Sequence, residues 1–189
     1  FIGRLPVREN SELETAVRKL IDYETNPAKG AWKNRTLFIG GNGSVFRDQA
    51  FALQQHVPPS VESQFLFTTK KSGSEYDPFF GGTADLIDHF QDGCAVMTFH
   101  GHGGGAIWSD NGLLRLEDAS RLYNEKKLPV ILSMTCFTGA FESPGRASLA
   151  DALLFDTRSG CVAMLGASGV GWVWNDYYLQ IELLKYMYS

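Results

Sequence analysis

Short apolar runs alternate with amphipathic stretches along the 189-residue chain. Five of these runs are rich in β-branched and aromatic residues and are bounded by Gly, Pro or polar residues, as strands are. Several are apolar on both faces, which is typical of strands buried inside a parallel sheet. The predicted strands lie at residues 36–40, 64–69, 95–99, 129–134 and 162–166.

The stretches between these strands have helical periodicity. Residues 11–24 carry Leu13, Val17, Leu20 and Ile21 at helical spacing, the pattern of a helix that packs on a core along one side. The other predicted helices lie at residues 46–56, 83–91, 116–125, 147–155 and 175–188.

The repeated order of strand, helix and strand predicts an α/β fold in one domain over residues 1–189. Its sheet is expected to be doubly wound and mainly parallel, with helices on both faces. Such sheets place their sites in the loops that follow the carboxyl ends of the strands. Three loops are therefore candidates, at residues 100–110, 135–143 and 167–174. The first contains two histidines, the second a cysteine and the third two tryptophans.

Composition narrows the choice of partner. Apolar residues make up 44% of the chain and charged residues 20%, as in ordinary globular proteins. The net charge of −4 gives no basic surface, so nucleic acid is not expected as a partner. No apolar run reaches the roughly 18 residues of a membrane-spanning helix, so no transmembrane segment is expected. Residues 1–6 read like a strand rather than a secretory leader, so none is expected in this piece.

The three cysteines cannot all pair with one another, so at least one thiol is free. None of them lies in a CxxC or metal-ligand spacing. Cys94 and Cys161 each begin an apolar run and are predicted to be small core residues. Cys136 instead follows the predicted strand at 129–134, in one of the three candidate loops.

The glycine-rich segment at residues 98–106 admits several interpretations. Gly101, Gly103 and Ala106 have the spacing of a dinucleotide-binding fingerprint, which requires a helix to begin there. The residues that follow, 107–112, are turn-like or hairpin-like instead. No phosphate-binding loop of the GK[ST] type exists either, so nucleotide binding is a weak interpretation.

Two further interpretations each require a residue elsewhere in the chain. The oxyanion loop of lipases and esterases needs a histidine after the nucleophilic serine, but all four histidines precede Ser168. A metal site could use His100 and His102, which lie on the same side of an extended strand end. Its third ligand would have to be Asp110 or Glu142, neither of which has a distinctive setting. No metal is therefore predicted.

A cysteine peptidase site requires fewer residues elsewhere in the chain than these alternatives do. It needs a thiolate nucleophile, an imidazole that protonates the leaving amine, and backbone N–H groups that bind the oxyanion. Cys136 and His102 lie in loops that follow successive strands, and Gly103 lets backbone N–H approach a substrate carbonyl. The alternative to a catalytic pair is that Cys136 is a buried thiol at a strand end and that His102 is an ordinary histidine in a turn.

These segments resemble the caspase-like cysteine peptidases, and their details are similar to the gingipain family. Gly-His-Gly at 101–103, with Trp108 downstream, resembles the family's histidine segment. Thr-Cys-Phe-Thr-Gly at 135–139 resembles its cysteine segment. Phe-Ile-Gly-Arg at 1–4 and the strand within 161–168 resemble two further segments, so the resemblance runs nearly end to end.

The resemblance implies a secreted cysteine endopeptidase of caspase-like fold, located outside the cytoplasm at a bacterial surface. It implies that His102 is the general acid and base, that Cys136 is the nucleophile, and that the N–H groups of Gly103 and Cys136 form the oxyanion hole. Trp174, or less closely Trp172, would wall the pocket for the residue before the cut. The substrate would be a protein or peptide that forms a thioester acyl-enzyme. No cofactor is implied, although structural calcium is allowed.

The chain departs from the gingipains after the strand at 36–40. There they carry a longer loop with one carboxylate near the catalytic histidine and another in an arginine pocket, whereas this loop has no acid before Asp48. Cleavage after arginine is therefore not expected, and Arg47 would disfavour basic substrates. This departure also motivates a rival function, an inactive interaction module that keeps the fold.

A second departure points to broader relatives of the gingipains. Residues 77–82 and 142–146 resemble those relatives, which include the sortase-like peptidase of the type IX secretion system. The resemblance to that peptidase implies that the substrate would be the sorting signal of a transported protein.

Overall fold

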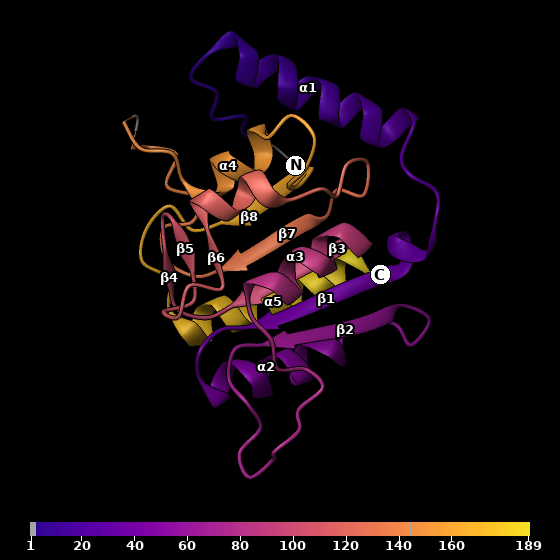
Figure 1. Ribbon diagram of the computed structural model, residues 1–189, viewed down its shortest axis with the longest axis vertical. Coiled ribbons are helices and arrows are strands. Elements are labelled where there is room, and N and C mark those ends of the chain that lie inside the picture. The colour runs from indigo at the N-terminus through magenta and orange to yellow at the C-terminus, as the bar shows by residue number, and fades with distance from the viewer. Residues whose placement is uncertain (1–2, 144) are drawn as a thin grey trace.

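A five-stranded parallel sheet lies at the centre of the computed structural model, which describes residues 3–143 and 145–189 (Figure 1). Its strands are β1 (Arg35–Gly40), β2 (Glu62–Phe67), β3 (Val96–His100), β7 (Val130–Met134) and β8 (Ala163–Gly166). They lie in the order β2-β1-β3-β7-β8, and every neighbouring pair is parallel. The carboxyl ends of all five strands therefore meet at one edge. The five predicted strands are confirmed, with small differences at their ends.

Helices cover both faces of this sheet. They are α2 (Ser44–Gln54), α3 (Thr83–Asp92), α4 (Leu149–Phe155) and α5 (Val173–Met187). Alternate side chains of a strand point to opposite faces, so Phe38 joins the apolar core under α2 and α5, while Leu37 and Ile39 join the core under α3 and α4. This arrangement confirms the predicted doubly wound sheet. Of the helices in the described part of the chain, none is long and apolar enough to cross a membrane.

The segment between β3 and β7 carries a small antiparallel sheet. It consists of β4 (Gly103–Gly104), β5 (Ile107–Trp108) and β6 (Leu114–Arg115), and the 3-10 helix η2 (Leu116–Arg121) follows. The hairpin-like character predicted after residue 106 is confirmed, but the helix predicted at 116–125 is wrong beyond 121. Asn124 is 2% exposed, and its side chain exchanges two hydrogen bonds of 2.8 Å with the backbone of Gly160. This long-range pairing takes the chain out of helical geometry.

The first helix, α1 (Asn10–Thr25), lies at the periphery and packs against α4; the 3-10 turn η1 (Ala31–Asn34) links it to β1 (Figure 1). The expectation that its apolar side faces the core is wrong. The four apolar residues at helical spacing are 37–55% exposed, while the residues buried along α1 are polar or small. The exposed residues are Leu13, Val17, Leu20 and Ile21, and the buried ones are Thr15, Ala16 and Lys19.

Lys19 is the main reason for this inverted packing. Its ammonium donates to the carbonyl oxygens of Leu153, Leu154 and Ser159 at 3.1, 3.0 and 2.8 Å. These carbonyls lie at and just beyond the carboxyl end of α4, where helix carbonyls lack partners and a cation is favourable. Burial lowers the pKa of Lys19. The contact holds α1 to the body through a polar anchor rather than an apolar face.

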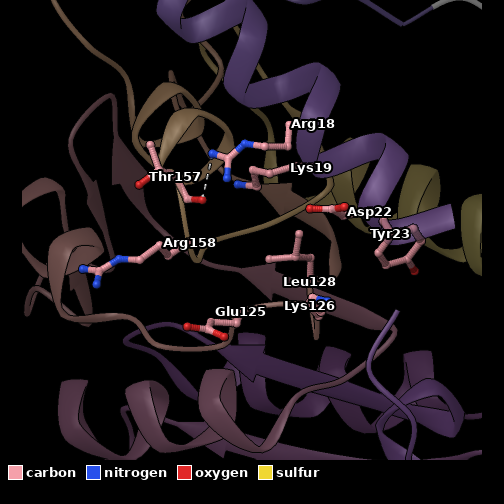
Figure 2. A pocket seen from close by; sticks show the side chains of 9 residues that line it. All are labelled: Arg18, Lys19, Asp22, Tyr23, Glu125, Lys126, Leu128, Thr157 and Arg158. Atoms are coloured by element: carbon pink, nitrogen blue, oxygen red, sulfur yellow. Dashed lines mark hydrogen bonds between the residues drawn. The ribbon is translucent and has the colours of Figure 1, made fainter. Parts of the chain in front are cut away.

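A small pocket of about 170 Å³ lies beside this anchor, between α1 and the segments that lead into β7 and β8 (Figure 2). Arg18 closes one side of it by donating to the carbonyl oxygen of Thr157 at 3.2 Å. The pocket lies at the amino ends of the strands, whereas sites in parallel α/β sheets lie at the carboxyl ends. We therefore do not assign it to the active site.

Candidate active site

The loops that carry His102 and Cys136 follow β3 and β7, which are hydrogen-bonded neighbours. A hydrogen bond of 3.4 Å from the Gly101 N–H to the carbonyl oxygen of Met134 joins the bases of the two loops. The predicted histidine and cysteine therefore lie on adjacent loops at the carboxyl edge of the sheet.

Gly103 brings these loops into closer contact. A Cβ atom placed on Gly103 would lie 2.7 Å from Thr135 Oγ1 and 2.7 Å from the carbonyl oxygen of Ile107, too close for any side chain. Thr135 immediately precedes Cys136, and Gly103 immediately follows His102. The missing side chain at Gly103 thus allows the close approach of the two loops that carry the predicted catalytic residues.

The imidazole of His102 is exposed but held on one side. Its ring meets the buried ring of Phe46 edge to face, with 5.3 Å between the ring centroids and 89° between the planes. Its carbonyl oxygen accepts from the Ser109 N–H at 2.8 Å. Such a histidine can exchange protons with a bound molecule while its backbone stays fixed.

Cys136 is half-buried, and the loop after β8 reaches its sulfur. The N–H of Gly171 donates to Sγ at 3.3 Å, and the Gly171 carbonyl oxygen lies 3.8 Å from the same sulfur. Phe137, the next residue, has a φ of 60° and donates its N–H to Gly169 at 2.9 Å. This bend turns the chain away after Cys136 and leaves the sulfur beside Gly171.

The backbone N–H of Gly103 is free to face a substrate. In the β4–β5 ladder Gly103 lies opposite Trp108. The Ser109 N–H bonds to the His102 carbonyl, and the Leu113 N–H takes the carbonyl of Trp108. These bonds make Gly103 and Trp108 a non-hydrogen-bonded pair, so the Gly103 N–H points away from β5. The orientation is compatible with the predicted oxyanion role of Gly103, whereas the same role for the Cys136 N–H stays a prediction.

The two tryptophans of the third loop occupy different places. Trp172 is 70% exposed and directly follows Gly171, the residue in contact with Cys136. Trp174 is 57% exposed and meets Tyr177 edge to face at 6.1 Å. It lines an open groove of about 380 Å³ between α2 and the amino end of α5, and Asp48 also lines this groove. Both tryptophans are therefore accessible, but only Trp174 belongs to the groove.

His100 does not share the setting of His102. Its ring is 1% exposed, and Nε2 donates to the carbonyl oxygen of Val173 at 3.2 Å, a tautomer assigned from the acceptor. Burial lowers the pKa of His100 to about 4, so the ring is neutral near pH 7. Within residues 3–143 and 145–189, no group of three or more His, Cys, Asp or Glu side chains could hold a metal ion. That no cofactor is needed stays a prediction.

The expectation that Arg47 disfavours basic substrates rests on a wrong premise. Its guanidinium forms a bidentate ion pair with Asp77 at 2.6 and 3.1 Å, and both side chains are less than 10% exposed. This pairing lowers the pKa of Asp77 to about 2, so the carboxylate keeps its charge. The charge of Arg47 is neutralised inside the fold instead of facing the site.

Sequence reasoning missed two contacts of the predicted catalytic pair. Phe46 reads as a core residue of an amphipathic helix, and the sequence has no signal that its edge faces His102. Gly171 lies in a loop selected for its tryptophans, whereas the contact with Cys136 comes from the glycine backbone. Both contacts join segments far apart in sequence, so local patterns could not reveal them.

The chain is similar in sequence to one family of peptidases. The sequence profile of peptidase family C25 matches residues 1–189. Gingipain R2 and gingipain R1 of Porphyromonas gingivalis are each 27% identical to this chain over 146 residues, or 75% of it. The aligned parts cover 19% of gingipain R2 and 14% of gingipain R1, so the chain spans only a small part of these relatives.

Solved structures show the same likeness. The crystal structure of the Arg-specific cysteine proteinase gingipain R has a TM-score of 0.80 at 22% identity, covering 99% of this chain and 44% of that one. The complex of the pro- and mature domains of Porphyromonas gingivalis RgpB gives 0.78 at 21% identity, covering 100% and 45%. At these identities the likeness concerns the fold. It confirms the caspase-like α/β class that the sequence resemblance implied.

Proposed function

The chain belongs to peptidase family C25, and we propose that it is a cysteine-type endopeptidase, which cleaves peptide bonds with His102 and Cys136. The observation that carries this proposal is the meeting of the two loops, where Gly103 packs against Thr135. A half-buried sulfur with an N–H donor and an exposed imidazole lie on those loops. Acyl transfer requires a nucleophile and a base within reach of each other, and the contact of the two loops supports such a placement of Cys136 and His102.

In the proposed reaction, the thiol proton of Cys136 passes to His102, and the thiolate attacks the peptide carbonyl carbon. A C–S bond forms while the carbonyl electron pair moves to oxygen, where the N–H groups of Gly103 and Cys136 bind it. The C–N bond then breaks, and His102 gives its proton to the leaving amine. Water, deprotonated by His102, attacks the thioester and releases the acid together with the Cys136 thiolate.

We place the side chain before the cut in the groove lined by Trp174 and Asp48. The gingipain R of the solved structure is Arg-specific. The proposal for this chain departs from the sequence expectation that cleavage after arginine is not favoured. Asp48, the first acid after β1, lines the groove, so an aromatic wall and one exposed carboxylate favour a basic side chain through cation–π and ionic contacts. The guanidinium of Arg47 is paired with Asp77 and does not line this groove, so it does not oppose a basic side chain there. Trp172, which directly follows Gly171, is assigned to a neighbouring part of the substrate surface.

The proposed setting is extracellular or at the bacterial surface, with a protein or peptide as substrate and no organic cofactor. The type IX sorting signal is a narrower form of the same proposal, since it specifies the substrate without changing the chemistry. The rival, an inactive interaction module, differs from all of these in one observable property. It has no need of a reactive thiol at Cys136.

The test is the rate at which iodoacetamide alkylates each cysteine between pH 5 and 9, followed by mass spectrometry. Cys94 and Cys161 are internal controls, because they are 1% and 0% exposed and burial raises the pKa of both to about 12. We expect rapid modification of Cys136 near neutral pH, slowed in a His102→Ala variant. A Cys136 that reacts no faster in the wild type than in the variant would support the inactive module.

A further inference from the structure

A chain of three buried polar side chains runs beneath the two proposed catalytic loops. The indole Nε1–H of Trp108 donates to Ser133 Oγ at 2.9 Å, and Ser133 Oγ lies 3.0 Å from Thr138 Oγ1. The three residues are 0%, 1% and 0% exposed. They come from three separate segments: the hairpin strand β5, the central strand β7 and the loop after β7.

The middle hydroxyl connects the other two groups because it can both accept and donate. An indole N–H only donates, so Ser133 Oγ accepts from Trp108. The remaining hydroxyl hydrogen of Ser133, or that of Thr138, then completes the second bond. Without Ser133 Oγ, both Trp108 and Thr138 would lose this partner in a dry interior, where an unmade hydrogen bond is costly.

Trp108, at one end of this series of hydrogen bonds, fixes the loop that carries His102. Trp108 lies opposite Gly103 in the β4–β5 ladder, and the next residue, Ser109, bonds to the carbonyl of His102. The Trp108 ring also stacks on Phe99 at 4.7 Å with 8° between the planes. Stacking sets the plane of the indole, and the hydrogen bond to Ser133 sets its direction within that plane. A shift of the indole would therefore move the backbone that carries His102.

Thr138, at the other end of the series, fixes the loop that carries Cys136. Thr138 lies two residues after Cys136, and its carbonyl oxygen accepts from the Ala150 N–H of α4 at 3.0 Å. Its neighbour Gly139 donates to the carbonyl oxygen of Ala167 at 3.0 Å. Ser133 itself sits inside the sheet, opposite Phe99 of β3 and Gly166 of β8. The serine therefore connects both loops to the centre of the sheet.

We propose that Ser133 is a positioning residue, which aligns the His102 loop with the Cys136 loop through Trp108 and Thr138. This inference rests on the proposed function, since it concerns the relative placement of that catalytic pair. Ser133 touches neither the substrate nor the reacting atoms. Its effect is on distance and angle, to which acyl transfer is sensitive, because a misplacement of about 1 Å can cost about 100-fold in rate.

The experiment measures how much His102 accelerates the alkylation of Cys136, in the wild type and in variants of Ser133 and Thr138. The readout is the ratio of the iodoacetamide rate constants of Cys136 with His102 intact and with His102→Ala, measured near neutral pH. Ser133→Ala removes the connecting hydroxyl. Thr138→Val removes the terminal hydroxyl with little change of shape, and Thr138→Ser restores it. We expect the ratio to fall about 10-fold or more in the first two variants and to recover in Thr138→Ser.

Thr36→Val is the matched control for a lost buried hydroxyl. Thr36 is 0% exposed and lies on β1, where its hydroxyl bonds to that of Tyr188, away from both loops. This variant should lower thermal stability as Thr138→Val does, yet leave the His102 contribution unchanged. If Ser133→Ala does not fold, Thr138→Val and Trp108→Phe test the same connection from its two ends.

The outcomes separate this inference from the proposed function. A wild type in which His102→Ala has no effect would overturn the dyad, and the positioning role with it. A wild type that depends on His102, with the same ratio in Ser133→Ala and Thr138→Val, would overturn the positioning role alone. A smaller ratio that Thr138→Ser restores, and that Thr36→Val does not reproduce, supports it.

Discussion

At the scale of single residues, two histidines only two positions apart have opposite fates. Both rings lie 5.3 Å from Phe46, so they point to the same side, as the strand geometry predicts. His100 is the last residue of β3 and lies under α5, whereas His102 lies beyond the strand in the open loop. Because His102 lies two residues further along the chain, its ring is exposed and can be proposed as catalytic, whereas the ring of His100 is buried and neutral.

The buried setting of His100 predicts a loss of stability on acidification. Its pKa is about 4 in the folded state, against about 6.5 in an unfolded chain, so only the unfolded chain takes up a proton between these values. The neutral His100 ring therefore contributes its full stabilisation above about pH 6.5. This contribution to the free energy of unfolding falls as the pH falls, by about 2 kcal/mol between pH 6.5 and about pH 4.5. Urea unfolding at these two pH values measures the loss. His100→Gln should remove this loss and His56→Gln should not; equal losses in both variants would contradict the assignment.

Gly103 and Gly104 form a second pair of neighbours with different roles. A Cβ atom on Gly103 would meet Thr135 at 2.7 Å, whereas one on Gly104 would have its nearest contact at 3.8 Å. Gly103→Ala should therefore separate the two loops and slow the His102-dependent alkylation of Cys136 about 10-fold or more, while Gly104→Ala stays near wild type. Rate constants for the two variants check this. Similar behaviour of both would show that the close approach at Gly103 is unimportant.

At the scale of elements, local patterns predicted which segments are strands and helices better than they predicted which side is buried. The strands have strong signals, since buried parallel strands are apolar on both faces. The amphipathic pattern of α1 is equally clear, but its apolar side is exposed because Lys19 finds acceptors at the end of α4. The helix predicted at 116–125 ends already at 121 for a related reason, the pairing of Asn124 with Gly160. In both cases one polar long-range contact overrides the local pattern.

The inverted packing of α1 gives an unusual mutational prediction. Lys19→Met should lower the free energy of unfolding by about 2 kcal/mol, because three buried carbonyls lose their donor. Val17→Lys, on the apolar but 41% exposed side, should change it by less than about 0.5 kcal/mol. Chemical denaturation of the two variants measures this difference. A larger loss from Val17→Lys than from Lys19→Met would mean that the apolar side of α1 packs on the protein.

At the scale of the whole molecule, the topology explains why the candidate loops could be placed at one edge of the sheet from the sequence. All five parallel strands end at one edge, so the residues after β3, β7 and β8 had to meet there. The sequence could therefore place His102, Cys136 and the tryptophans at one edge. It could not order them within that edge, because the contacts of Gly171 with Cys136 and of Phe46 with His102 depend on the packing of distant loops.

The same topology separates the molecule into two ends. The pocket beside Lys19 lies at the amino ends of the strands (Figure 2). The groove lined by Trp174 lies between α2 and the amino end of α5, the helix that follows the carboxyl end of β8. Variants of α1 are therefore expected to affect stability with little effect on the reactivity of Cys136. Variants of the loops after β3 and β7 are expected to affect mainly the reactivity.

The central claim is that this fold cleaves peptide bonds through Cys136. Its most direct measurement is the appearance of new amino termini when the protein is incubated with a peptide library, identified by mass spectrometry. We predict cleavage by the wild type, none by Cys136→Ala or His102→Ala, and unchanged cleavage by Cys161→Ala. Cleavage that persists in Cys136→Ala, or a wild type that generates no new termini, would contradict the account.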